Sequence, residues 1–324
     1  MSQLLIGLLG VMVSTNQPTA VSNLVARATG VSVAIPNAND PLEKEYQQLL
    51  ADDDAAQAEV DQWIRDNAKF AEQGAGLSRA GLAAKVNQRL DRVKEAYLSF
   101  LLKHPQHARA RLAYASFLGD IGDEDAAIEQ AEKAREADPK NPAAWNNLAN
   151  LYGHRGPVRK AFDYYEKAIE LNPTEPVYLQ NFATTVYLFR KDAREHYGLD
   201  EQGVFTKALG LYERAVKLDP ANFQLVTDWA SSYYGIKPPR YEEAVAAWEY
   251  ALKIARDDIE RQGVQIHLAR FKINLRRFDE AREHLAAVRH EMYGVLKERA
   301  SENLRKREEE AKAPAQPKQA DTDQ

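Results

Sequence analysis

Alanines recur along the middle of this chain at nearly regular intervals, and this spacing constrains the fold more than any other feature. Ala127, Ala161, Ala208, Ala244 and Ala281 are separated by 34, 47, 36 and 37 residues. Self-similarity with a period of 20 to 50 residues is typical of stacked supersecondary units. In each period, apolar residues form two stripes at helical spacing. The pattern therefore predicts a row of helix pairs, each packed on the next.

The stretch Pro142–Glu175 shows the pattern most completely. Its marker residues are Trp145, Leu148, Ala149 and Tyr152, then, after the break at Gly156–Pro157, Ala161, Tyr165, Ala168 and the closing Pro173. This spacing resembles the tetratricopeptide repeat signature. The resemblance implies an all-α, right-handed superhelical α-solenoid of helix-turn-helix pairs. It also implies that partners bind a concave groove lined by the first helix of each pair.

The register of the markers divides the chain into five expected parts. Residues 1–36 are an apolar N-terminal segment and linker, and residues 37–107 are a helical pair that forms a degenerate repeat. The solenoid covers 108–290, with repeats near 108–141, 142–175, 176–222, 223–257 and 262–290. We expect residues 291–312 to form a capping helix with an apolar stripe of Met292, Val295, Leu296 and Leu304, and residues 313–324 to be a disordered tail.

The N-terminal segment contains an unbroken apolar run from Leu4 to Val13. Ten residues match the h-region of a signal peptide and are too few to span a bilayer as a helix. No Lys or Arg precedes Arg27, and the cleavage site is poor, so an apolar helix packed on the first repeat or a membrane-resting segment stays open. We expect an exported, periplasmic or envelope-associated protein rather than a cytoplasmic one, with membrane contact only through residues 4–13.

Composition and motifs argue against catalysis and nucleic-acid binding. The chain has no cysteine, which excludes disulfides, thiolate metal sites and a catalytic thiol, and its net charge of −5 gives no reason to expect a nucleic-acid partner. His104 and His107 have metal-like spacing but no third ligand in view. No Walker loop, dinucleotide fingerprint, nucleophile elbow or zinc-protease motif is present. We therefore expect no enzyme activity, cofactor or metal.

The non-marker positions of the first helices define the predicted groove. Amides, hydroxyls and phenols dominate there, and such side chains can hydrogen-bond an extended peptide. The candidates are Arg109, Asn146, Asn150, His154, Gln180, Thr184, Tyr187, Thr227, Ser231, Tyr234 and Arg270. Asn146 and Asn150 resemble half of the carboxylate clamp of chaperone-docking members, without its lysines. Asn147 and Asn181 occupy a second recurring polar position, which is also common in ordinary repeats.

The 47-residue interval reveals an insertion at Lys191–Gln202. We expect a loop whose Arg194, His196 and Tyr197 contribute to binding, because long loops on rigid scaffolds often carry function. A short extra helix folded over the solenoid edge is the structural alternative. These observations favour a protein-interaction scaffold or adaptor that binds a peptide or protein segment. The alternatives are an envelope-associated assembly factor tethered by residues 4–13, and an enzyme with its site in the insertion.

Overall fold

The computed structural model describes residues 40–312, and these form helices and connecting turns without a strand. The chain divides into two compact units, Met1–Asn181 and Phe182–Gln324, which are described separately. The predictions for residues 1–36 and for the tail from 313 lie outside the described residues. Between residues 40 and 312, no helix has the length and apolar character needed to cross a membrane.

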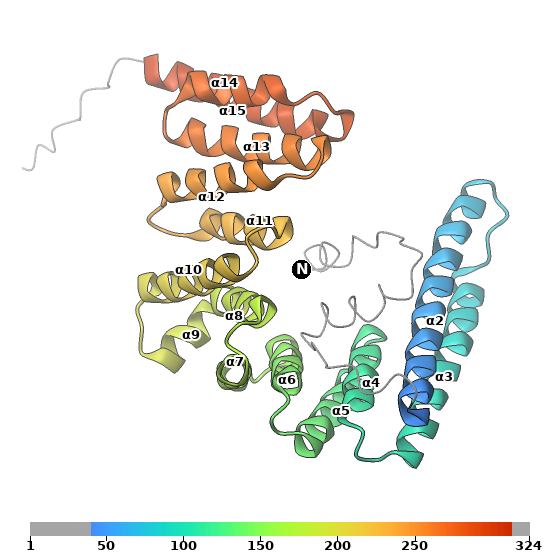
Figure 1. Ribbon diagram of the computed structural model, residues 1–324. Helices are drawn as coiled ribbons and strands as arrows, with labels where there is room; N and C mark the ends of the chain where they lie inside the picture. The colour runs from blue at the N-terminus through green and yellow to red at the C-terminus, as the bar shows by residue number, and fades with distance from the viewer. Residues whose placement is uncertain (1–39, 313–324) are drawn as a thin grey trace, which may run out of the picture. The chain divides into compact units, whose positions relative to one another are not determined.

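The first unit begins with two long helices, α2 (Pro41–Glu72) and α3 (Arg79–Lys103), which run side by side (Figure 1). Asp40 caps α2, because its carboxylate accepts a hydrogen bond from the Leu42 amide at 3.0 Å. Ser78 caps α3 in the same way through the Gly81 amide at 3.1 Å. The core of this pair lies near its Asp40 end, around Tyr46, Tyr97 and Phe100.

Two shorter helix pairs follow in the first unit. They are α4 (Ala108–Asp120) with α5 (Glu124–Ala137), and α6 (Pro142–Arg155) with α7 (Val158–Leu171). The predicted marker alanines are fully buried in both pairs, among them Ala127, Ala149 and Ala161. Side chains this small let helix backbones approach closely, while large rings fill the remaining space. The prediction that the marker alanines belong to the core is therefore confirmed, whereas the marker rings Trp145 and Tyr152 are half-buried. Helix α8 (Pro176–Leu188) crosses the boundary between the units.

The second unit continues the same pattern with a short helix before its first long one. Its elements are α9 (Arg190–Tyr197), α10 (Glu201–Leu218), α11 (Phe223–Ser232), η2 (Tyr233–Gly235), α12 (Tyr241–Ile254), α13 (Asp258–Asn274), α14 (Phe278–Ala287), η3 (Glu291–Tyr293) and α15 (Gly294–Lys312). Marker residues Ala208, Ala244 and Ala281 are buried here too. The described residues are thus all-α and built from helix pairs, which confirms the predicted fold class.

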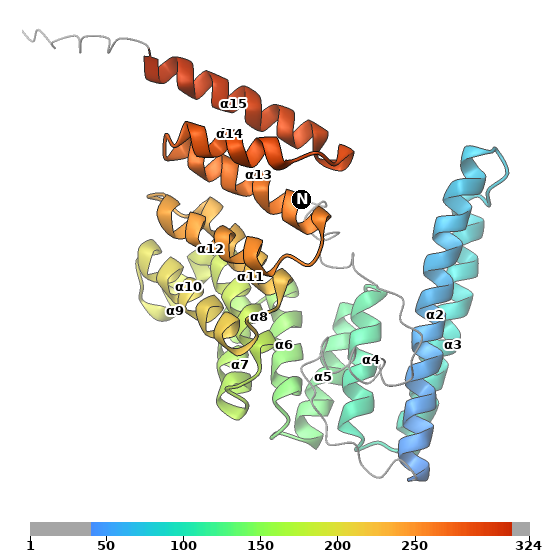
Figure 2. The same ribbon diagram turned by 45° about the horizontal axis from the view of Figure 1, so that its top comes forward.

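The last helix, α15, lies against α14 and α13 (Figure 2). Its buried residues are Ala300 and Leu304, which join a cluster with Ala269 and Leu285. Three of the four residues of the predicted apolar stripe, Met292, Val295 and Leu296, are instead exposed. Met292 belongs to η3 and lies outside α15, whereas Val295 and Leu296 are in the first turn of α15, before the residues that join the cluster with α13 and α14.

Candidate functional site

In the first unit, the predicted groove residue Asn146 is fully buried. Its side-chain nitrogen donates to the Asn147 amide oxygen at 3.4 Å, and its oxygen accepts from the Asn181 amide at 3.2 Å. A buried amide needs such partners, because an unsatisfied polar group costs free energy. Contrary to the expectation from its register, Asn146 therefore joins neighbouring first helices and offers no surface to a ligand.

The rest of α6 offers a reduced polar surface. Asn150 is half-buried and accepts a hydrogen bond from the Tyr165 hydroxyl at 2.6 Å. His154 is exposed near the end of the helix, and Gln180 is half-buried on α8. Of the candidates on α6, His154 is thus the most accessible.

Arg109 is occupied by an ion pair within the first unit. Its guanidinium donates to both carboxylate oxygens of Glu43 at 2.8 and 3.0 Å and lies 4.5 Å from the centre of the Tyr46 ring. Burial raises the pKa of the Glu43 carboxyl, but the hydrogen bonds from Arg109 and Gln47 and the charge of Arg109 together outweigh burial and hold that pKa below its ordinary value. Arg109 therefore closes α2 against α4 instead of lining an open groove.

In the second unit, Tyr234 and Arg270 form an exposed pair. Tyr234 is 41% exposed, and the Arg270 guanidinium lies 5.1 Å from the centre of its ring. Neither an ion pair nor a hydrogen bond is recorded for the Arg270 side chain among the described residues. Its donors can therefore bind a carbonyl or carboxylate oxygen of a ligand, while the tyrosine ring covers an apolar group.

A half-buried histidine holds Tyr234 in place. The His267 ring stacks on the Trp248 ring with centroids 4.0 Å apart, and its Nδ1 lies 2.8 Å from the Tyr234 hydroxyl oxygen. Burial, with a smaller contribution from Arg270, lowers the pKa of His267 to about 4, so the ring is neutral at pH 7. A neutral ring protonated on Nε2 accepts the hydroxyl hydrogen at Nδ1. This bond and the contact of Tyr234 with Phe271 at 4.6 Å fix the phenol in place.

The sequence analysis did not single out His267. The repeat register gave no signal for it, because Tyr234 lies in η2, just after α11, whereas His267 lies inside α13. The predicted residues of α11 itself differ in access. Ser231 is exposed, whereas Thr227 is half-buried and donates its hydroxyl to the Gln224 carbonyl at 2.9 Å.

On the part of α8 that belongs to the second unit, the two predicted residues have internal roles. The Thr184 hydroxyl lies 2.7 Å from the Tyr212 hydroxyl. Tyr187 is half-buried, and its hydroxyl occupies the space that a Cβ at position 235 would need. Gly235 is therefore required for this close approach. Thr184 and Tyr187 thus contribute mainly to the packing of the unit.

The insertion begins as a helix, not as the predicted loop. Helix α9 covers Arg190–Tyr197 and ends at Gly198, whose left-handed backbone (φ 63°) terminates helices readily. Its residues adopt a helix because Ala193 is buried and anchors the short segment against the unit. Residues 190–197 thus form the short extra helix that the sequence analysis gave as the alternative to a loop.

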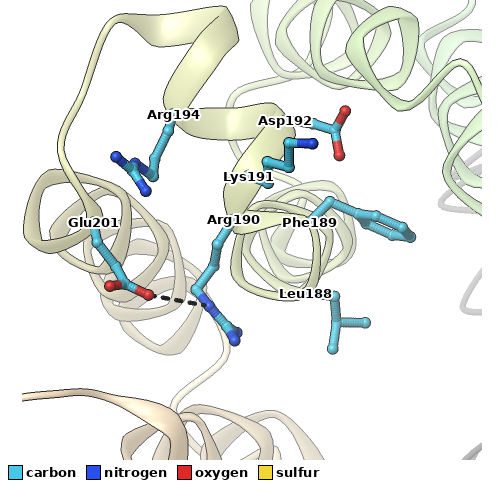
Figure 3. A pocket seen from close by; sticks show the side chains of 7 residues that line it. All are labelled: Leu188, Phe189, Arg190, Lys191, Asp192, Arg194 and Glu201. Atoms are coloured by element: carbon cyan, nitrogen blue, oxygen red, sulfur yellow. Dashed lines mark ion pairs between the residues drawn. The ribbon is translucent and has the colours of Figure 1, made fainter.

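A cavity of about 350 Å³ lies beside α9 (Figure 3). It is lined by Leu188, Phe189, Arg190, Lys191, Asp192, Arg194 and Glu201. Arg190 donates to the Tyr187 carbonyl at 2.9 Å and lies 3.8 Å from the Glu201 carboxylate. Arg194 reaches this cavity, but His196 and Tyr197 are not among its lining residues. Of the three predicted insertion residues, Arg194 therefore lines the cavity, whereas His196 and Tyr197 lie outside its lining.

The Tyr197 ring contacts two neighbouring side chains and so contributes to the stability of the unit. The Lys207 ammonium lies 3.9 Å from the centre of its ring, and His196 meets the same ring edge-on at 4.5 Å. We expect Tyr197→Ala to lower the free energy of unfolding by about 1 kcal/mol, because a cation–π contact and ring burial are lost. Arg194→Ala, at an exposed position, should change it by less than about 0.5 kcal/mol. Chemical denaturation of both variants measures the difference, and equal losses would contradict the assignment.

Comparison with known families identifies the helix pairs α4–α5 and α6–α7. Two tetratricopeptide repeat families match the chain, one over residues 142–175 and the other over residues 108–151. The chain contains tetratricopeptide repeats. These repeats are protein-interaction modules and typically do not catalyse reactions. Within residues 40–312, no three histidine, cysteine or acidic side chains are arranged to hold a metal ion.

Several solved structures of tetratricopeptide repeat (TPR) proteins are similar to this chain. YrrB, described as a TPR protein with an unusual peptide-binding site, is 16% identical with a TM-score of 0.47, covering 64% of this chain and 98% of YrrB. MamA is 22% identical with a TM-score of 0.42, and the match covers 55% of this chain and 95% of MamA. TTC0263, a thermophilic TPR protein from Thermus thermophilus, is 21% identical with a TM-score of 0.42, and the match covers 61% of this chain and 98% of TTC0263. No curated protein matches the sequence.

Proposed function

We propose that this protein is a non-catalytic interaction scaffold that binds an extended peptide or protein segment along the first helices of its TPR pairs. The observation that carries the proposal is the pair of Tyr234 and Arg270 in the second unit. Both side chains are exposed, and Tyr234 is fixed by a half-buried neutral histidine. Surface aromatic and arginine side chains held in one orientation are typical of binding hot spots, because little conformational entropy is lost on binding.

The chemistry of the pair indicates what it binds. The Arg270 guanidinium can donate hydrogen bonds to a backbone carbonyl or a carboxylate of the peptide, and the Tyr234 ring can cover a neighbouring apolar side chain. Ser231, exposed on α11, adds a hydroxyl that can donate or accept. An extended segment with an acidic or carbonyl-rich stretch next to an apolar residue therefore suits this surface best. In the first unit, His154 and the accessible part of Asn150 are the corresponding contacts.

The experiment uses peptides selected from a random library on the full-length protein. We expect Tyr234→Ala/Arg270→Ala to weaken the binding of selected peptides at least about tenfold, since each hot-spot residue contributes on the order of 1 kcal/mol or more. Fluorescence polarisation gives the dissociation constants. Circular dichroism should show an unchanged helix content, because both side chains are on the surface.

The matched control is a tyrosine and a basic side chain on a second helix. Tyr250→Ala/Lys253→Ala removes an aromatic ring and a cation from α12 and should leave the affinity within about twofold. Equal weakening by the two double variants, or none by Tyr234→Ala/Arg270→Ala, would contradict a binding surface on the first helices.

A further inference from the structure

The outer part of the α2–α3 hairpin has no buried residue. Between residues 57 and 92, every side chain is exposed or only half-buried, whereas Tyr46, Ala56, Val93 and Tyr97 at the other end are buried. Both views show α2 and α3 continuing side by side well beyond α4 and α5 of the same unit (Figures 1 and 2). Helices in proteins are stable mainly because an apolar face is packed, so two helices alone hold this part of the hairpin weakly.

Apolar side chains are available on this outer part, but they are not covered. Val60 and Trp63 of α2 are half-buried, while Ile64 is 48% exposed and Phe70 and Leu77 are each 53% exposed. Ile64 follows Val60 by four residues and Phe70 follows Trp63 by seven, so the exposed residues continue the same helical stripe. The end of a repeat array normally carries a polar outer face. An apolar stripe at this place indicates an interface.

The two helices carry opposite charge in this region. From residue 57 to 72, α2 has four carboxylates and two basic side chains, a balance of −2. From residue 79 to 92, α3 has four basic side chains and one carboxylate, a balance of +3. Only Glu59 and Arg89 form an ion pair with each other here, at 2.8 Å. For Asp61, Glu72, Arg79 and Arg92, no ion pair is recorded among the described residues.

We propose that the outer part of the α2–α3 hairpin binds the same hairpin of a second copy of the chain. In a twofold arrangement, the acidic α2 of one copy lies on the basic α3 of the other, and the reverse contact forms at the same time. The charge pattern of one hairpin is thus complementary to itself. The exposed apolar stripes of the two copies then bury each other in a four-helix bundle.

The available area suits a weak dimer. From residue 57 to 72, α2 rises about 24 Å, and a two-helix face about 20 Å wide therefore offers roughly 500 Å² on each copy. An interface that buries about 1,000 Å² in total lies at the low end of specific interfaces, where weak and transient contacts occur. The hairpin needs no contribution from the TPR pairs for this contact, so the inference is independent of the peptide-binding function.

The first test is the mass of the full-length chain by sedimentation equilibrium. We expect twice the chain mass of 36.5 kDa for the wild type at high micromolar concentration and the single chain mass for Ile64→Glu/Phe70→Glu. Met292→Glu/Val295→Glu is the matched control, because it places two charges on exposed apolar residues of the second unit. This control should remain dimeric. A monomeric wild type would overturn the proposal.

A charge exchange tests the arrangement without relying on apolar residues. Asp61→Lys/Glu72→Lys and Arg79→Glu/Arg92→Glu should each weaken self-association at least about tenfold, because like charges then face each other across the interface. A mixture of the two variants should form a heterodimer, because the α2 made basic in one variant then faces the α3 made acidic in the other. If neither variant dissociates, or if the mixture stays monomeric, the hairpin is not the contact surface.

The N-terminal segment is the competing occupant of this surface. If the wild type is monomeric but a chain lacking residues 1–39 is dimeric, the segment covers the hairpin in place of a second copy. That result would overturn the proposal. A dimer whose affinity is the same with and without residues 1–39 supports it.

Discussion

Arg109→Met is expected to lower the free energy of unfolding by about 3 kcal/mol at pH 7. Glu43 is only 5% exposed, and the Arg109 guanidinium supplies hydrogen bonds to both of its carboxylate oxygens. Removing one partner of a buried ion pair leaves an uncompensated charge, which is far more costly than the loss of a surface pair. Urea denaturation followed by circular dichroism measures the change.

Two control variants separate this effect from general damage. Arg89→Met breaks the more exposed pair with Glu59 in the same unit and should cost less than about 1 kcal/mol. Glu43→Gln/Arg109→Met removes both charges and should recover a large part of the loss. If Arg89→Met and Arg109→Met destabilise equally, the Glu43–Arg109 pair has no special role.

The cost of Arg109→Met should also depend on pH. Because the folded-state pKa of Glu43 lies below its ordinary value, the stabilisation by this carboxylate is fully present above the ordinary pKa and is lost as pH falls through the lowered one. In the variant, the Gln47 hydrogen bond still opposes the effect of burial, but the opposition from Arg109 is lost, so the protonated form of Glu43 is more favoured than in the wild type. The difference in stability between wild type and variant should therefore shrink as pH falls below about 4.

Tyr97→Phe is expected to cost about 2 kcal/mol at pH 7. Asp53 is 7% exposed, and the fully buried Tyr97 donates its hydroxyl hydrogen to the Asp53 carboxylate at 2.7 Å. Without the hydroxyl, a buried acceptor loses its partner, which typically costs about 1 to 3 kcal/mol. Tyr114→Phe is the matched control, because Tyr114 stacks on Tyr97 at 5.0 Å and no hydrogen bond is recorded for its hydroxyl in the described part of the chain.

The loss caused by Tyr97→Phe should increase with pH. Burial raises the pKa of Asp53, against the opposing effect of the Tyr97 hydrogen bond. The folded state therefore binds the Asp53 proton more tightly than the unfolded state, so ionisation of Asp53 reduces stability as pH rises through the raised pKa. Tyr97→Phe should then be less costly at pH 4 than at pH 7. In an Asp53→Asn background, a loss that stays at about 2 kcal/mol at both pH values would contradict this explanation.

The candidate site shows where sequence reasoning was insufficient. Helical spacing placed Asn146 and Arg109 on the predicted groove face, but spacing describes only one helix and not what packs against it. A neighbouring amide at Asn181 and a carboxylate at Glu43, each far away in the sequence, occupy these two side chains. Tyr234 and Arg270 were predicted as separate groove residues, and only the tertiary contacts show that His267 holds Tyr234 beside Arg270.

Spacing along the chain was enough to establish the fold class and the positions of the core. Marker alanines such as Ala127 and Ala161 could be assigned in this way, because only small residues permit the close helix packing that a repeated pair requires. Contacts between helices determine which polar side chains are free to bind, since each depends on partners from other helices. They also show that the insertion starts with helix α9 and that the outer part of α2–α3 lacks a covering layer. Both facts depend on what lies beside a helix, which its own sequence does not contain.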